Sequence, residues 1–290
     1  MRFAFIQEEK ATYPVTALCR TLAVSRCGFY AWRGRPESKR DSEDRRLTML
    51  VRVSYEESRR TYGSPRIHLD LAEWNERTGR KRVARLMRQA GFKARVRRRY
   101  KCTTMSEHDQ PIAPNLLARR FEAAHPNQRW VTDTTELLAG GGRVYLAAVL
   151  DLYSRLIVGW ALSAVNDRHL TLNALDQALR RRHPEVGLLH HSDQGSTYAS
   201  EDYRNTLTAH GITCSMSRRG NCHDNAAMES WFSTLKFELG ERFDSAADAK
   251  HQLFDYIEVF YNQKRRHSSV GNVAPAEAER RYAVGAQPAA

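Results

Sequence analysis

The chain contains few cysteines, and their spacing argues against two common kinds of site. Five cysteines occur in 290 residues, and none of them forms a CxxC pair. An odd number without such a pair argues against a disulfide framework and a zinc knuckle, and it favours a reducing cytoplasm. The sequence also has no run of eighteen apolar residues and no signal-peptide core at its N-terminus. We therefore expect a cytoplasmic protein that does not associate with membranes.

Acidic residues are scarce in the first third of the chain. Residues 1–101 contain 26 Lys and Arg but 11 Asp and Glu, a net charge of +15, whereas residues 102–290 contain 20 against 22, a net charge of −2. The whole formal excess of +13 therefore lies in the first third. A balance this basic indicates an anionic partner such as nucleic acid. Hydrophobic residues make up 41% of the sequence, which is enough for a packed core and argues against global disorder.

The first third also has the pattern of short helices. Residues 14–32 predict two helices with a tight turn, and Ser25 is a suitable N-cap for the second. This is the outline of a helix-turn-helix, although an ordinary helical hairpin fits the pattern as well. Residues 36–60 are highly charged and predict a further helix. We expect residues 1–101 to form an all-α DNA-binding region.

A second predicted helix pair carries the first candidate DNA contacts. Residues 65–77 and 80–90 form this pair, and the later helix has an apolar stripe at i, i+3 and i+4. Arg82 and Arg85 fall off that stripe, and a basic arm follows the helix. We predict that both arginines contact DNA phosphates, because basic helices and arms suit phosphate binding. The alternative is a solvated charged face.

The remainder of the chain predicts a linker and then an α/β domain. Residues 102–127 contain three prolines and predict a linker with one short helix near Leu116–Ala123. From residue 128 to about 282, three strands come first, and helices then alternate with strands. This order predicts a mixed five-stranded sheet with helices on both faces. Residues 283–290 form a tail. The predicted strands are 130–138, 144–151, 156–162, 186–192 and 212–217, and the predicted helices are 167–182, 200–210, 225–239 and 246–262.

Three carboxylates in this part of the chain are candidate metal ligands. Asp133 lies in the strand WVTD, Asp193 comes just after the strand LLHHS, and Glu229 lies on the helix NAAMESWFSTLK. Converging carboxylates repel each other by about 4 kcal/mol per pair at 4 Å and an effective dielectric near 20. Divalent cations remove that cost, Mg²⁺ prefers oxygen ligands, and two ions can catalyse an in-line phosphoryl transfer. Taken singly, Asp193 could instead cap a turn, and Glu229 could face solvent.

Basic residues near these carboxylates are further candidates for DNA binding. Lys236 follows Glu229 by seven residues and therefore projects from the same helical face. Arg218 and Arg219 precede Gly220 in a predicted loop. All three could hold phosphates, and all three could instead serve only solubility. The adjacent residues His190 and His191 alternate across a strand, so we expect them to be packing residues.

The ordered motifs of the chain resemble those of a known family. WVTDTTEL, LDLYSR, HHSDQGSTY, SRRGNCHDNAAMESWFSTLKFE and YNQKRRHSSVGNVAPAE together resemble the integrase core of OrfB-type transposases of the IS-three insertion-sequence family, relatives of retroviral integrase. YPVTALCRTLAVSRCGFYAW, YGSPRI and KRVARLMRQAGFKAR resemble the N-terminal region of the same family. The retroviral zinc-binding His-His-Cys-Cys pattern is not present in the sequence.

The resemblance implies a fold, a reaction and partners. It implies a ribonuclease H-like core, preceded by a helix-turn-helix-type region, with an Asp–Asp–Glu triad at Asp133, Asp193 and Glu229. It implies cleavage and strand transfer of insertion-sequence ends with Mg²⁺, for which Mn²⁺ substitutes. The implied partners are transposon-end and target DNA, further copies of the chain, and the upstream-frame (OrfA) product or a fusion to it. The implied location is the bacterial nucleoid.

Two other functions stay open at this point. The first is a nuclease or resolvase with the same fold, which would cleave DNA without joining it. The second is a catalytically idle DNA-binding partner of the upstream-frame protein. One fold hosts many functions, so only the chemistry of the site separates these possibilities.

Overall fold

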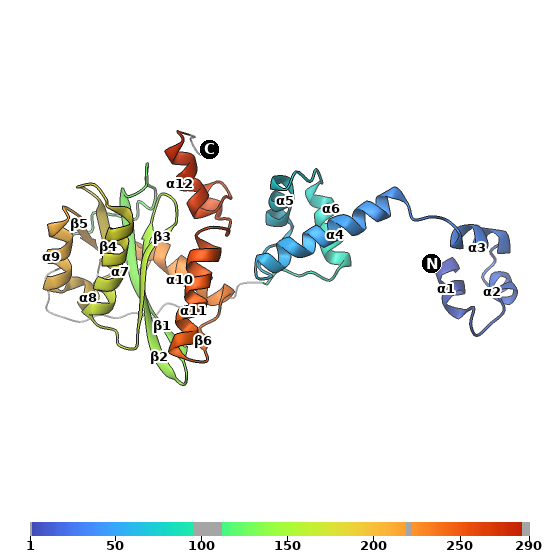
Figure 1. Ribbon diagram of the computed structural model, residues 1–290, viewed down its shortest axis with the longest axis horizontal. Helices are drawn as coiled ribbons and strands as arrows, with labels where there is room; N and C mark the ends of the chain where they lie inside the picture. Colours follow the sequence, from blue (N-terminus) through green and yellow to red (C-terminus); the bar gives the residue numbers. More distant parts are fainter. Residues whose placement is uncertain (1, 96–111, 219–221, 286–290) are drawn as a thin grey trace. The chain divides into compact units, whose positions relative to one another are not determined.

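The computed structural model describes residues 2–95, 112–218 and 222–285 (Figure 1). It divides into two compact units, residues 1–93 and 94–290. No helix within these described ranges is both long and apolar enough to cross a membrane.

Three short helices form the first part of the N-terminal unit. They pack around the buried side chains of Ile6, Cys19 and Phe29. Ser25 accepts a hydrogen bond of 2.9 Å from the backbone N–H of Gly28, so the predicted N-cap is confirmed and the two predicted helices are present. The first helix was not predicted from the sequence. The bounds are α1 (Arg2–Glu9), α2 (Val15–Thr21) and α3 (Arg26–Arg33).

Three further helices complete this unit. Figure 1 shows α5 and α6 lying beside the long helix α4, and Val51, Ile67 and Val83 are fully buried between them. The predicted apolar stripe of the last helix is the face that packs in this core, because Leu86 and Met87 are buried with Val83. The N-terminal unit is therefore all-α, as predicted. The bounds are α4 (Lys39–Glu57), α5 (Ser64–Glu73) and α6 (Arg80–Gln89).

The C-terminal unit is built on a mixed sheet, which confirms the predicted fold class. The strand order is β3-β2-β1-β4-β5, and the two-residue strand β6 pairs with β1. The first three strands are antiparallel, and β4 and β5 run parallel to β1. The bounds are β1 (Arg129–Ala139), β2 (Gly142–Asp151), β3 (Ile157–Ser163), β4 (Leu189–Ser192), β5 (Thr213–Met216) and β6 (Arg242–Phe243).

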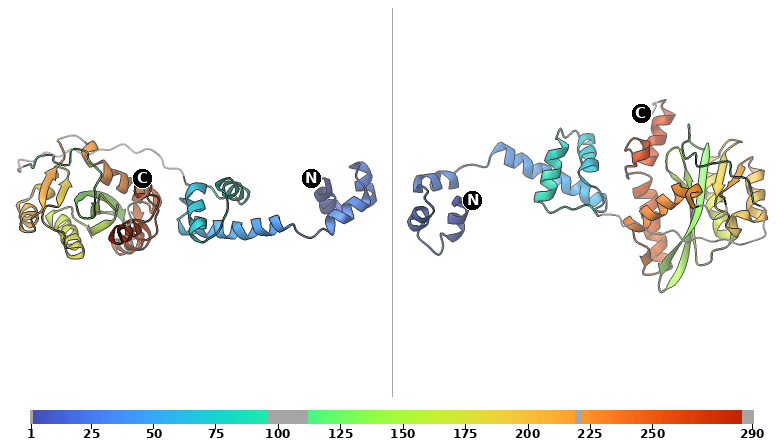
Figure 2. Two further views of the ribbon diagram at one scale, coloured as in Figure 1. Left: turned by 90° about the horizontal axis from the view of Figure 1, so that it is seen from above. Right: turned by 180° about the vertical axis from the view of Figure 1, so that it is seen from behind.

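Helices cover both faces of this sheet, as the views in Figures 1 and 2 show. α7 (Arg168–Arg182), α8 (Ser196–Ala199) and α9 (Glu201–Ala209) bury one face. α10 (Ala226–Glu238), α11 (Ala246–Phe254) and the π-helix η2 (Asp255–Tyr261) bury the other. α7 lies so close to β3 that a Cβ at Gly159 would be 2.2 Å from the carbonyl oxygen of Ala174. The remaining described elements are η1 (Cys222–Asn225), η3 (Ser268–Val270) and α12 (Pro275–Ala283).

The helix predicted near Leu116–Ala123 is wrong, because this segment forms a turn. Asn115 accepts a hydrogen bond from the backbone N–H of Ala118 through its side chain, which is an Asx-type alternative to helical bonding. Ala118 and Arg119 both have positive φ angles, which end any right-handed helix. Ser215 accepts hydrogen bonds from the two backbone N–H groups before the turn. Tertiary contacts therefore override the local helical propensity.

Candidate active site

Asp133 lies on the central strand β1, on the face that α10 covers. Side chains alternate along a strand, and β1 follows this rule: Trp130 packs with α7 and Val131 with α10. Thr132 bonds to Tyr198 on the α7 side. Asp133 therefore projects toward α10, and it is partly buried there. Its Oδ1 accepts a hydrogen bond of 2.7 Å from the backbone N–H of Thr134, which orients the carboxylate.

Asp193 comes directly after β4, the strand beside β1. The parallel register pairs Val131 with His191. When this register is continued by two residues, Asp133 and Asp193 are at the same level, on strands about 4.8 Å apart. Asp193 Oδ1 accepts a hydrogen bond of 2.9 Å from the backbone N–H of Gly195. The turn-capping role considered for Asp193 is therefore present, and it orients the carboxylate beside β1.

Glu229 lies in the first turns of α10, which begins beside β1. Asn225, at the N-cap position of α10, donates a hydrogen bond of 3.0 Å from Nδ2 to the carbonyl oxygen of Thr132. Residues four apart share one helical face, so Glu229 lies on the same side of α10 as Asn225. The helix thus brings Glu229 close to the strand that carries Asp133.

The charges of Asp193 and Glu229 both affect the pKa of Asp133. Burial raises the pKa of Asp133 well above its usual value, and the negative charge of Asp193 raises this pKa further. The hydrogen bond from Thr134 lowers the pKa, and the charge of Glu229 raises it. Both predicted partner acids therefore act on Asp133. Like charges that meet in a partly desolvated place need a compensating cation or a proton.

The carboxylates are not arranged as a complete metal-binding site. No three His, Cys, Asp or Glu side chains of the described residues are already arranged to hold a metal ion. The donor set nevertheless fits Mg²⁺, since all three groups supply hard carboxylate oxygens and Mg²⁺ binds through few protein ligands and several waters. The raised pKa of Asp133 points the same way: burial is its main cause and repulsion by Asp193 adds to it, and a divalent cation would favour the charged carboxylate against both.

Asp224 organises the approach to α10, and it was not predicted from the sequence. It has no exposed surface, and Arg218 and Arg119 donate hydrogen bonds to its carboxylate. The hydrogen bonds from Arg218 hold the pKa of Asp224 well below its usual value, although burial opposes them. The only signal in the sequence is the position of Asp224, five residues before Glu229.

The predicted DNA-binding residues lie in different settings. Lys236 is partly buried and lies two turns beyond Glu229 on α10, about 10 Å along the axis. Arg82 and Arg85 form ion pairs of 2.7 and 2.6 Å with Asp44 of α4, so they link two helices of the N-terminal unit. Arg218 is paired with Asp224, as described above. Arg219 and the basic residues from 96 to 101 lie outside the described residues.

The two histidines before Asp193 are packing residues, as expected. His191 is buried between the hydroxyls of Ser215 and Ser217, at 2.9 and 3.1 Å, and burial lowers its pKa to about 4. His190 is buried on the opposite face beside the Tyr203 hydroxyl at 3.1 Å, and burial lowers its pKa to about 3. Both rings are therefore neutral at physiological pH.

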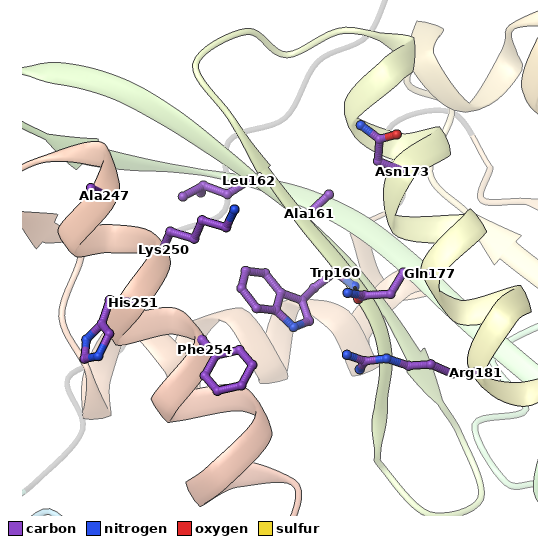
Figure 3. Close-up of a pocket in the computed structure, with 10 residues that line it drawn as sticks. All are labelled: Trp160, Ala161, Leu162, Asn173, Gln177, Arg181, Ala247, Lys250, His251 and Phe254. Atoms are coloured by element: carbon purple, nitrogen blue, oxygen red, sulfur yellow. Dashed lines mark hydrogen bonds between the residues drawn. The ribbon is translucent and has the colours of Figure 1, made fainter.

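One cavity lies apart from the carboxylates. It measures about 650 Å³ and is lined by β3, α7 and α11, with Trp160, Lys250 and Phe254 among its residues (Figure 3). β3 is the edge strand, and β2 separates it from β1. No Asp or Glu lines the cavity, so it is distinct from the candidate active site.

Comparisons with known proteins agree with this architecture. Two family models, each described as an integrase core domain, match residues 123–222 and 210–275, and an HTH-like domain matches residues 42–100. The chain is thus of the integrase-core class, with a helical N-terminal region. A 31 kDa protein of insertion element IS600 from Shigella sonnei is 42% identical, over 91% of this chain and 98% of its own length. Transposase InsF of insertion sequence IS3A from Escherichia coli (strain K12) is 36% identical, over 96% and 98%. The chain therefore belongs to the IS-three (IS3) family of insertion-sequence transposases.

More distant solved structures also match. The catalytic core domain of HTLV-2 integrase, in complex with magnesium, is 15% identical and has a TM-score of 0.40, with 54% of this chain and 98% of that domain covered. The simian T-cell lymphotropic virus intasome in complex with a PP2A regulatory subunit is 13% identical and has a TM-score of 0.46, with 75% and 70% covered.

Proposed function

We propose that this chain cleaves the ends of an insertion sequence and transfers them to target DNA, and that Asp133, Asp193 and Glu229 bind the divalent ions of this reaction. The observation that carries the proposal is the electrostatic effect of Asp193 and Glu229 on Asp133. An acid from a loop and an acid from a helix thus both act on Asp133 of the central strand. Membership of a transposase family supports the reaction, and carboxylate oxygens suit Mg²⁺, for which Mn²⁺ substitutes.

In this proposal the three acids bind the ions, and neighbouring groups of the protein hold the acids in position. Bound ions supply a means to activate the attacking oxygen and to stabilise the leaving oxygen of the DNA phosphate. The backbone N–H groups of Thr134 and Gly195 fix the orientation of Asp133 and Asp193. Helix α10 carries the third acid, Glu229, in its first turn. The protein thereby provides orientation and negative charge, which are the main protein contributions to phosphoryl transfer.

Other parts of the chain are assigned to DNA binding and to connecting the domains. We assign residues 1–101 to DNA binding, 102–127 to a linker, 128–282 to the catalytic core and 283–290 to a tail; the +15 charge of the first region supports the first assignment. We propose that Lys236 holds a phosphate near the acids, and its position on the same helix as Glu229 supports this. We keep Arg82, Arg85, Arg218 and Arg219 as DNA contacts; for the first three this requires exchange of a carboxylate partner for a phosphate.

The proposal also includes partners. Two ends of one element must be held together for transfer, so we infer that several copies of the chain assemble on DNA. The resemblance to OrfB adds the upstream-frame product, or a fusion to it, as a second partner. The reaction then takes place on the bacterial nucleoid.

An end-cleavage assay tests this function. Labelled insertion-end DNA with Mg²⁺ should be cleaved and joined by the chain, alone or fused to its upstream frame. Asp133→Asn, Asp193→Asn and Glu229→Gln should each lower the rate by about 10³-fold or more, because ligand loss removes several kcal/mol of transition-state stabilisation. DNA binding should persist, and combined substitutions should lose little more than single ones.

The matched control is Asp202→Asn, an exposed acid of α9 that pairs with Arg168. Its rates should equal those of the wild type. Cleavage without joining would favour the nuclease alternative. DNA binding without any metal-dependent cleavage, in both forms of the protein, would favour the idle partner.

A further inference from the structure

The first turn of α10 is held by two adjacent residues that the proposed chemistry does not use. Asp224 has no exposed surface, and its carboxylate accepts five hydrogen bonds. Asn115 and Arg119, which precede the sheet in the chain, donate at 2.8 Å each. Arg218 donates from its backbone N–H at 3.0 Å and from its guanidinium at 2.9 and 2.8 Å. One carboxylate thus fastens three segments together.

Asn225 attaches the same turn to the central strand. Its side chain is 4% exposed, and its Nδ2 donates to the carbonyl oxygen of Thr132 at 3.0 Å. Its Oδ1 is buried and accepts no hydrogen bond within the described part of the chain. A buried side-chain amide whose oxygen accepts no hydrogen bond destabilises the fold. The presence of Asn225 at this position is therefore better explained by a functional role than by stability.

The position of the amide supplies that reason. Thr132 immediately precedes Asp133 on β1, and Asn225 lies one helical turn before Glu229 on α10. This hydrogen bond therefore ties the strand of one acid directly to the start of the helix that carries the other. Two carboxylates that are brought close together repel each other unless a cation lies between them. A link that holds α10 against this repulsion keeps Glu229 within reach of a shared ion.

We propose that Asp224 and Asn225 are positioning residues that hold Glu229 beside Asp133, an inference that rests on the proposed metal-binding role of these acids. Asp224 anchors the segment before α10 through Arg218 and Arg119, and Asn225 anchors α10 to β1. Arg218 thereby has a role within the protein, through its pairing with Asp224, besides its proposed contact with DNA. Support of this kind around a ligand typically changes metal affinity or activity by about 10- to 100-fold.

Mn²⁺ binding to the full-length chain without DNA tests the inference directly. The signal of free Mn²⁺ in electron paramagnetic resonance gives the dissociation constant. Asn225→Ala should raise this constant by about 10- to 100-fold, and Arg218→Ala should raise it by about 10-fold, because the backbone N–H and Arg119 still hold Asp224. The matched controls are Asn173→Ala on the exposed side of α7 and Arg180→Ala in an exposed ion pair with Asp176. Both should bind Mn²⁺ as the wild type does.

A kinetic readout separates positioning from DNA contact. Arg218→Ala should raise the Mg²⁺ concentration that gives half-maximal end cleavage, whether or not KM for DNA also rises; a change in KM alone would make Arg218 a DNA contact only and overturn its positioning role. Wild-type Mn²⁺ affinity in a folded Asn225→Ala variant overturns the inference. If that variant does not fold, Arg218→Ala decides the question, because its side chain is 59% exposed. Asp133→Asn is the reference: if it too binds Mn²⁺ normally, the proposed metal site itself is wrong.

Discussion

The C-terminal end of α10 contains a buried ion pair whose removal should be costly. Arg265 donates three hydrogen bonds of 2.8 to 3.0 Å to Glu238, and the two side chains are 8% and 3% exposed. Burial alone would lower the pKa of Arg265, but the hydrogen bonds to Glu238 together with the charge of Glu238 outweigh it and raise this pKa. Tyr256 completes the group, because its hydroxyl donates to Glu238 at 2.8 Å.

We expect Arg265→Met to destabilise the C-terminal unit by about 3–5 kcal/mol, because it leaves the Glu238 charge buried without a cation. For a unit of this size, 1 kcal/mol corresponds to about 2–4 °C, so Tm should fall by about 6–20 °C. The triple variant Glu238→Leu, Arg265→Met, Tyr256→Phe replaces the whole polar group by apolar side chains. Its Tm should return to within a few degrees of the wild type, since such replacements are often neutral or stabilising.

Differential scanning calorimetry on the metal-free chain measures both changes, and it can separate the transitions of the two units. Arg265→Lys is a further comparison, because it keeps the charge and loses the bidentate geometry. A drop of less than about 2 °C in Arg265→Met would refute the argument, since it would show that Glu238 is solvated or finds another cation. A triple variant as unstable as the single one would equally contradict it.

The remaining predictions concern charge. Asp133→Asn should raise Tm of the metal-free chain at pH 8, because the folded-state pKa of Asp133 is raised by burial and by neighbouring acids. The protonated acid stabilises the folded protein fully below about pH 4, and this contribution is lost as pH rises through the raised pKa. Melting curves at several pH values check this, and a gap that widens toward low pH would contradict the sign. Lys236→Ala should weaken end binding and strand transfer and leave Tm unchanged, while Lys236→Arg should retain part of both; wild-type rates in the alanine variant would show that Lys236 only faces solvent. The double variant Glu43→Gln, Asp44→Asn should release Arg82 and Arg85 toward phosphates, because Arg82 pairs with both acids and Arg85 with Asp44. Gel-shift titrations should then show tighter DNA binding and a salt slope steeper by up to about two units. Unchanged affinity with a lower Tm would mean that both arginines only join α4 to α6.

The sequence was most informative where the pattern is local. Ser25 could be assigned as an N-cap because the capping bond lies within one turn, and the structure contains it. The strands of the core could be placed because apolar runs and turn residues recur along the chain. The strands that carry Asp133 and precede Asp193 were among them, whereas the pairing of β1 with β4 comes from the structure.

The sequence was least informative where the partner is distant. Asp224 meets Arg119 from 105 residues away, and no local pattern reports such a contact. The same limit applies to Arg82, whose partner Asp44 lies 38 residues earlier, so the basic helix face was interpreted as a DNA surface or a solvated face and not as a link to another helix. The turn after Asn115 was mistaken for a helix because two backbone N–H groups beside it donate hydrogen bonds to Ser215 on strand β5, about 100 residues later in the chain.

The central claim is that one metal site joins β1, the loop after β4 and the start of α10. Fe²⁺ in place of Mg²⁺, with ascorbate and peroxide, generates radicals that cut the polypeptide beside the bound ion. We predict cuts near Asp133, Asp193 and Glu229 in the wild-type chain, suppressed by excess Mg²⁺ and lost in Asp133→Asn. Cuts at other positions, or the same cuts in Asp133→Asn, would contradict the claim.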